Sequence, residues 1–257
     1  MIDEIVDGSV SGGSNTSHTI ILPALRALLD SVPPTGALYD YERAALDDNV
    51  LGKATEGSRK RTFRYLKELY LLRPDRVLFR ALRDLWSDDL AAQPLLAGLC
   101  ALARDAVFRG SADAIIDSNP GDAVTSRDLA GSVEKRFPDS YSENTLAKIG
   151  RNTFSSWEQT GHLQSGGRAV KSRVRAVCRP ADVAYALLLG NLQGSRGQAL
   201  FETTWAKVLD QPRSHLMDLA FGASQRGLLE LRNAGGVVDV GFRELLRPIE
   251  GDQGVLL

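Results

Sequence analysis

Short amphipathic segments closed by proline or glycine are the feature that most limits how this chain can fold. Their apolar residues recur at spacings of three and four, which is typical of helices with one buried face. Pro33-Pro34, Pro138 and Gly161 each interrupt or end such a segment. The pattern covers residues 18–32, 36–52, 58–72, 75–86, 125–138, 140–159, 181–210 and 214–234. The sequence therefore predicts a mainly α protein built from short helices.

Two Gly-Gly pairs interrupt the helical pattern. The sequence LQSGGRAVKSRVR at 163–175 alternates cationic and apolar residues after Gly166-Gly167, which predicts a β-hairpin. Gly235-Gly236 is expected to end a helix, and the following VVDVGF predicts a short strand. The β content is therefore expected to be small and confined to such hairpins.

The predicted fold class is mainly α, with helix-turn-helix or winged-helix units whose short β-hairpin wings pack on a helical core. We expect a flexible N-terminus at 1–17, because its Gly and Ser residues cannot build a core, and a loose tail at 251–257. Between them we expect an N-terminal helix-turn-helix-like domain at 18–90 and a helical C-terminal domain at 91–250. A winged-helix unit is expected within the latter at about 121–179.

Capping signals divide residues 125–159 into two helices. Thr125 with Asp128 resembles a capping box, and Ser140 with Glu143 fits the S-x-x-E form of the same motif. One stripe of the second helix carries amides and cations but no acid: Asn144, Lys148, Arg151, Asn152, Ser155 and Gln159. Cations attract phosphates, while Asn, Gln and Arg make paired hydrogen bonds to base edges, so this stripe predicts contact with nucleic acid.

The positive charge of the chain is concentrated in two regions, although the net charge is only −1. Residues 53–83 hold ten Lys and Arg against three acids, and residues 144–179 hold seven against one. Clustered cations are typical of a surface that binds a polyanion, whereas solvated basic helix faces are the plainer interpretation. Both clusters fall on short helices followed by a turn, and this favours the first interpretation.

Candidate nucleic-acid-binding residues follow from these two clusters. A third helix expected from Ser58 places cations on one side, and Arg76, Arg80 and Arg83 form a matching basic stripe on the next helix. The hairpin at 163–175 would lay its cations along a neighbouring phosphate backbone. The candidates are Lys60, Arg61, Arg64, Lys67, Asn144, Lys148, Arg151, Asn152, Arg168, Lys171, Arg173 and Arg175.

Motifs for catalysis or cofactor binding are not found in the sequence. His18, His162 and His215 share no spacing typical of a metal site, the two cysteines form no C-x-x-C, and no Walker A motif is present. The longest apolar runs are too short for the roughly twenty residues that a membrane-spanning helix needs. The chain begins without the pattern of a signal peptide. We therefore expect a cytoplasmic protein that is not an enzyme, with no metal, cofactor or membrane contact.

The order of several segments resembles the BrxA family of the BREX phage-defence systems. The resemblance rests on NVLGKATEGSRKRTFRYLKELYLL, the helix pair around LLAGLCALARD, YALLLGNLQGSRGQALFETTWAKVLD and MDLAFGASQRGLLELRNAGGVVDVGF. It implies a small, mostly helical cytoplasmic protein that binds double-stranded DNA without catalysis and acts alongside other BREX proteins. The family has no compact binding motif, so the resemblance assigns no residue.

These observations predict a non-enzymatic double-stranded-DNA-binding component of a BREX system, with mainly phosphate contacts and weak sequence preference. Two alternatives stay open. A helical module of this charge could bind RNA, or its basic faces could dock on an acidic subunit of a defence complex as a protein-interaction scaffold.

Overall fold

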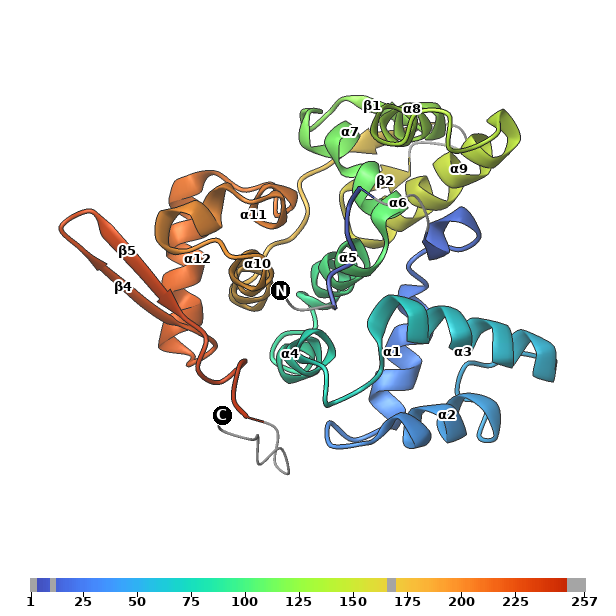
Figure 1. The fold of residues 1–257 in the computed structure, drawn as a ribbon, viewed down its shortest axis with the longest axis horizontal. Helices are drawn as coiled ribbons and strands as arrows, with labels where there is room; N and C mark the ends of the chain where they lie inside the picture. Colours follow the sequence, from blue (N-terminus) through green and yellow to red (C-terminus); the bar gives the residue numbers. More distant parts are fainter. Residues whose placement is uncertain (1–3, 10–12, 166–169, 249–257) are drawn as a thin grey trace.

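The computed structural model describes residues 4–9, 13–165 and 170–248, and it is mainly helical (Figure 1). The 3₁₀ helices are η1 (Ser14–Thr16) and η2 (Gly197–Glu202). The α-helices are α1 (Leu22–Ser31), α2 (Leu38–Leu46), α3 (Glu56–Tyr70), α4 (Val77–Trp86), α5 (Gln93–Arg104), α6 (Ala106–Gly110), α7 (Ala112–Ile116), α8 (Ser126–Arg136), α9 (Glu143–Gln159), α10 (Pro180–Leu192), α11 (Thr204–Val208) and α12 (Arg213–Gln225). The strands are β1 (Ala123–Thr125), β2 (Leu163–Ser165), β3 (Val170–Arg173), β4 (Glu230–Ala234) and β5 (Val237–Gly241).

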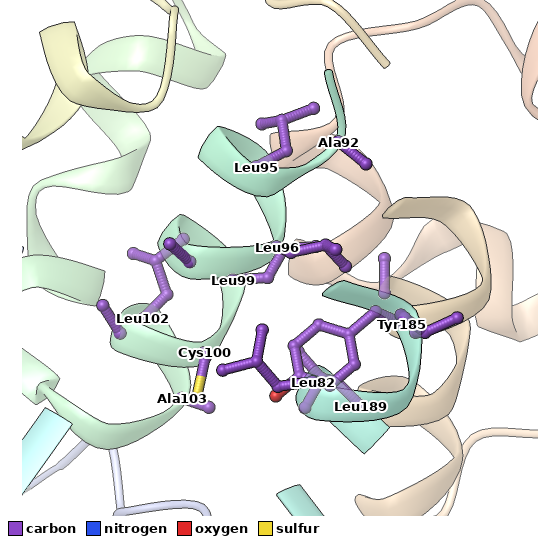
Figure 2. Packing of buried hydrophobic residues seen from close by; sticks show 14 of the residues in the cluster. Leu82, Ala92, Leu95, Leu96, Leu99, Cys100, Leu102, Ala103, Tyr185 and Leu189 are labelled. Carbon is purple, nitrogen blue, oxygen red and sulfur yellow. The ribbon is translucent and has the colours of Figure 1, made fainter. Parts of the chain in front are cut away.

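Helix α5 lies at the centre of the molecule. Around it, α1–α3 form one group, α7–α9 with β1–β3 a second, and α10–α12 with β4–β5 a third (Figure 1). Figure 2 shows Leu96 and Leu99 of α5 beside Leu82 of α4 and Tyr185 of α10. The hydroxyl of Tyr185 donates to the Leu78 carbonyl at 2.9 Å, which satisfies its one polar atom. Packing is therefore continuous across residue 90, where the sequence predicted a boundary.

The small sheet of the second group is antiparallel, with strand order β1-β3-β2. Ala123 is opposite Ser172, and Leu163 is opposite Arg173. Strands β2 and β3 confirm the predicted hairpin, whereas β1 was not predicted because three residues carry too little periodicity. The positions of Gly166 and Gly167 lie outside the described residues.

The third group ends in a second hairpin, where the sequence led us to expect a longer helix. Helix α12 ends at Gln225, and β4 pairs with β5 from Glu230↔Gly241 to Ala234↔Val237. Gly235 and Gly236 form the turn with φ of 59° and 82°, a conformation that glycine adopts without strain. The expected helix end at Gly235 is therefore wrong, because this pair closes a hairpin.

Helix starts are partly as predicted. Thr125 and Asp128 form the expected capping box of α8, in which the Thr125 amide donates to the Asp128 carboxylate at 2.8 Å. Helix α9 is capped by Ser142 and not by Ser140, and α3 is capped by Thr55 and begins before Ser58. Each side chain accepts a backbone N–H that the first turn leaves unpaired.

The N-terminal segment is held to the core, which corrects the expectation of a flexible lead-in for its described residues. Both side-chain oxygens of Glu4 accept backbone N–H groups at the start of α4, from Val77 and Leu78. Asn15 is buried, and its amide groups donate to the carboxylate of Asp105. In the part of the chain that the structure describes, no helix has both the length and the apolar character needed to cross a membrane.

Candidate nucleic-acid interface

Residues 13–21, here called the N-terminal connector, lie between α3 and α9. In Figure 1 this blue segment separates the two helices, and η1 contacts both. On the α3 side, the Tyr70 hydroxyl donates to the Ile20 carbonyl at 2.6 Å. On the α9 side, the Ser156 hydroxyl donates to Asn15 Oδ1 at 2.8 Å, and Gln159 Oε1 accepts from the Leu22 amide at 2.9 Å. The connector therefore joins two helices that are far apart in sequence.

The connector carries His18 at the point where the two positive clusters meet. The imidazole lies against the Tyr65 ring of α3, with 3.9 Å between ring centroids. The pKa of His18 is lowered, first because burial disfavours its charged form and then because of the positive charges of Arg61, Lys148, Lys53 and Arg64. Two of these cations belong to α3 and one to α9. The clusters that the sequence placed apart thus converge on one surface.

The candidates on α3 all lie on its exposed side. Lys60 pairs with Glu56 at 2.5 Å, and Arg64 lies 3.7 Å from Glu68 with its guanidinium 4.9 Å from the Tyr65 ring centroid. Arg61 and Lys67 are exposed as well. Exposed i, i+4 pairs of this kind are worth only a few tenths of a kcal/mol, so a phosphate can replace the carboxylate at small cost. These four residues are available to a polyanion.

On α9, the candidates divide into exposed and structural residues. Asn144, Lys148 and Arg151 are exposed at helical spacing. Asn152 is only half-exposed, and its Nδ2 donates to the Asn15 carbonyl at 2.9 Å. Asn152 therefore holds the connector, and the expectation that it offers its amide to a base is wrong. Lys53, Arg61, Arg64, Lys148 and Arg151 are called the α3–α9 face below.

The predicted hairpin cations do not line an outer surface, which corrects the sequence analysis. Lys171 and Arg173 are 7% and 1% exposed, whereas Val170 of the same strand is 43% exposed. Lys171 pairs with Glu158 at 2.8 Å, and Arg173 pairs with Asp210 at 2.9 Å. The alternating pattern was thus correct in period, but the cationic positions face the protein and not the solvent.

The remaining two hairpin candidates differ from this buried pair. Arg168 lies outside the described residues. Arg175 is exposed and stands 4.0 Å from the Asp210 carboxylate, beyond hydrogen-bonding distance. Of the hairpin cations within the described residues, only Arg175 keeps a solvent-facing guanidinium. The hairpin therefore contributes less positive surface than the sequence indicated.

Two groups of residues at this face could not be identified in the sequence. His18 and Tyr65 could not be paired from the sequence, since their ring contact joins the connector to α3 across distant positions in the chain. Lys53 belongs to the basic cluster, but its place near His18 depends on the loop before α3. The high positive charge of residues 53–83 was the one sequence signal that indicated this face.

The α3–α9 face has the chemistry of an anion-binding surface. Its lysine and arginine side chains can donate to phosphate oxygens. Within the described residues, no group of three or more His, Cys, Asp or Glu side chains is arranged to hold a metal ion. No family model matches this chain, and the comparison with curated proteins finds no significant match either.

Proposed function

We propose that this chain is a non-enzymatic double-stranded-DNA-binding protein whose α3–α9 face contacts the phosphate backbone. The observation that carries the proposal is that η1 contacts both α3 and α9, which brings the exposed Arg61, Arg64 and Lys148 near the connector that carries His18. Exposed cations gathered on neighbouring helices repel one another, so they favour a bound polyanion that offsets the repulsion.

The arrangement around α9 supports a winged-helix mode of binding. The elements follow the order α7, β1, α8, α9, β2 and β3, in which α9 corresponds to the helix that enters the major groove. Asn144, Lys148 and Arg151 lie along its exposed stripe. Lys148 and Arg151 would contact phosphates, and Asn144 at the helix start would reach base edges. Few base contacts imply weak sequence preference.

The order of segments that resembles the BrxA family supports a place for the protein in a BREX defence system. In that setting the protein would be cytoplasmic and would act with other BREX proteins without catalysing a reaction. Co-purification of its genomic neighbours with the tagged chain tests this part. Retention of those partners after nuclease treatment would favour the scaffold alternative over DNA-mediated association.

Charge reversal on α9 is the decisive experiment for DNA binding. The Lys148→Glu, Arg151→Glu double variant replaces two phosphate-binding cations with repulsive carboxylates on exposed positions, so we expect affinity for a short duplex to fall at least about a hundredfold. The matched control is Arg232→Glu, an exposed arginine of β4 on the far hairpin. The control should bind as the wild type does, and equal loss in both proteins would contradict the proposal.

The dependence on salt tests whether phosphate contacts dominate. If about six phosphates are neutralised, wild-type affinity should fall on the order of a thousandfold between about 50 and 200 mM salt. An affinity that does not change over this range would overturn the proposal. Competition with duplex RNA of the same sequence separates the RNA alternative, which would be favoured if RNA displaced DNA at lower concentration.

A further inference from the structure

A pocket away from the α3–α9 face contains three arginines. It has a volume of about 470 Å³ and lies between α4, the turn after α1 and the segment that follows β5. Its lining includes Pro34, Phe79, Arg80, Arg83 and Arg247. The sequence had placed Arg80 and Arg83 on an outward basic stripe, and this expectation is wrong because both are buried, at 9% and 7% exposure.

Arg80 is buried without enough partners for its guanidinium. Its Nη2 donates to the Leu245 carbonyl over 3.4 Å, while Nε and Nη1 have no hydrogen-bond partner among the described residues. Burial lowers the pKa of Arg80 and the nearby charge of Arg247 lowers it further, while the carboxylates of Asp84 and Glu4 act in the opposite direction. A buried cation with unpaired N–H groups is costly, and a bound anion removes that cost.

The other charges around the pocket leave it positive. Arg83 donates through Nη2 to the Leu29 and Val32 carbonyls, at 2.7 and 2.5 Å, so it ties α4 to the end of α1. Arg247 is held by Asp84 at 2.6 Å. Among the residues that line the pocket, three guanidinium groups thus stand against one carboxylate. Because Asp84 is engaged by Arg247, no carboxylate of the pocket lining is left for Arg80.

We propose that this pocket binds an oxyanion through Arg80, with Arg247 at its rim. A guanidinium can donate to two oxygens of a phosphate or a carboxylate, and two of the three nitrogens of Arg80 have no partner among the described residues. The volume is within the range of small-molecule sites, and Pro34 and Phe79 supply an apolar wall for the body of the ligand. A small molecule with a phosphoryl or carboxylate group fits this chemistry.

The oxyanion can belong to a phosphorylated or to a carboxylated small molecule. Both groups present two oxygens to a guanidinium, so the experiment includes one arm for each.

Thermal unfolding in inorganic phosphate tests the site. We expect the Tm of the full chain to rise by about 5 °C in saturating phosphate relative to chloride of equal ionic strength, because a ligand of the folded state stabilises it. In Arg80→Met the phosphate-dependent rise should disappear. Arg232→Met, on exposed β4, is the matched control and should keep the wild-type rise.

The second arm replaces phosphate with acetate at equal ionic strength. A saturable rise with one anion alone assigns the site to that group, and a saturable rise with both assigns it to oxyanions of either kind. No saturable rise with either anion, or a rise that survives in Arg80→Met, overturns the proposal.

Discussion

The second and third groups of the molecule have the same order of secondary-structure elements but differ in the charge of their exposed helix surfaces. In the second group α8 leads to α9 and the β2–β3 hairpin, and in the third α11 leads to α12 and the β4–β5 hairpin. Thr125 caps α8 and Thr203 caps α11, each accepting a backbone N–H. Strand β1 pairs with β3, and η2 contacts β5 in the corresponding place. The two groups therefore correspond in the order of their elements, in the threonine that caps their first helix and in the element that lies beside their hairpin.

Their exposed helix stripes show the difference. On α9 the stripe carries Asn144, Lys148 and Arg151, whereas on α12 it carries Asp218, Phe221 and Gln225. Phe221 is 57% exposed. An acid and an exposed aromatic ring are unsuited to a phosphate backbone. The comparison teaches that this architecture alone does not make a nucleic-acid surface, because the charge on the stripe decides what it attracts.

Breaking the contact between the two groups is expected to have the largest effect, a loss of stability. Arg173 of β3 is buried against Asp210, which precedes α12, so Arg173→Met leaves a carboxylate and several carbonyls without their cation. We expect the free energy of unfolding to fall by about 3–5 kcal/mol, measured by urea denaturation. Arg213→Met removes an exposed pair with Glu202 at 2.7 Å and should cost under about 1 kcal/mol. Equal losses would show that the groups do not depend on the buried pair.

Acid should weaken the same contact through His162. Its Nε2 lies 2.8 Å from the Val208 carbonyl, which can only accept, so Nε2 carries the proton of the neutral ring. Nδ1 lies 2.7 Å from the Thr160 hydroxyl, which also donates to the Trp157 carbonyl. Complete burial lowers the pKa of His162 from 6.5 to about 3. Below about pH 6.5 the unfolded chain therefore binds the proton more readily, and stability falls as the pH drops towards 3.

At about pH 4 this histidine should cost roughly 3 kcal/mol of stability relative to neutral pH. The measurement is the unfolding free energy across this range in the wild type and in His162→Gln, which should lose stability less steeply. His215→Gln changes an exposed histidine of α12 and is the control. If His162→Gln kept the wild-type slope, the acid sensitivity would belong to other groups.

The smallest expected effect comes from giving α12 the charge of α9. The Asp218→Lys, Gln225→Lys variant places two cations on exposed positions of the α12 stripe, and each can add a phosphate contact. We expect affinity for a short DNA duplex at low salt to rise by about fivefold. Asp218→Asn with Gln225 unchanged separates loss of repulsion from new attraction. A fall in affinity would mean that α12 cannot approach a duplex.

Local signals in the sequence predicted many of the helices and the β2–β3 hairpin. The capping box of Thr125 and Asp128 and the alternation after Gly166-Gly167 depend on neighbours along the chain, so they can be recognised without a structure. The hairpin at Gly235-Gly236 was taken for a helix end because glycine closes both kinds of element. Strand β1 was missed because it gains its conformation from pairing with β3.

The candidate site was predicted less well than the fold. Lys60, Arg61, Arg64 and Lys67 lie on a solvent-facing side as the helical period indicated. The sequence could not show that Lys171 and Arg173 are buried. An alternating strand has two faces, and only the acids of α9 and of the segment before α12 decide which face turns inward.

The sequence by itself determined a mainly helical chain, the β2–β3 hairpin and the concentration of positive charge in two regions, because these follow from the residues and their near neighbours. Tertiary structure alone decided which cations are free. It brought α3 and α9 together across the N-terminal connector, and it buried Arg80 in a pocket and Arg173 beside Asp210. Such choices depend on the energy of burying a charge, which is set by partners distant in sequence.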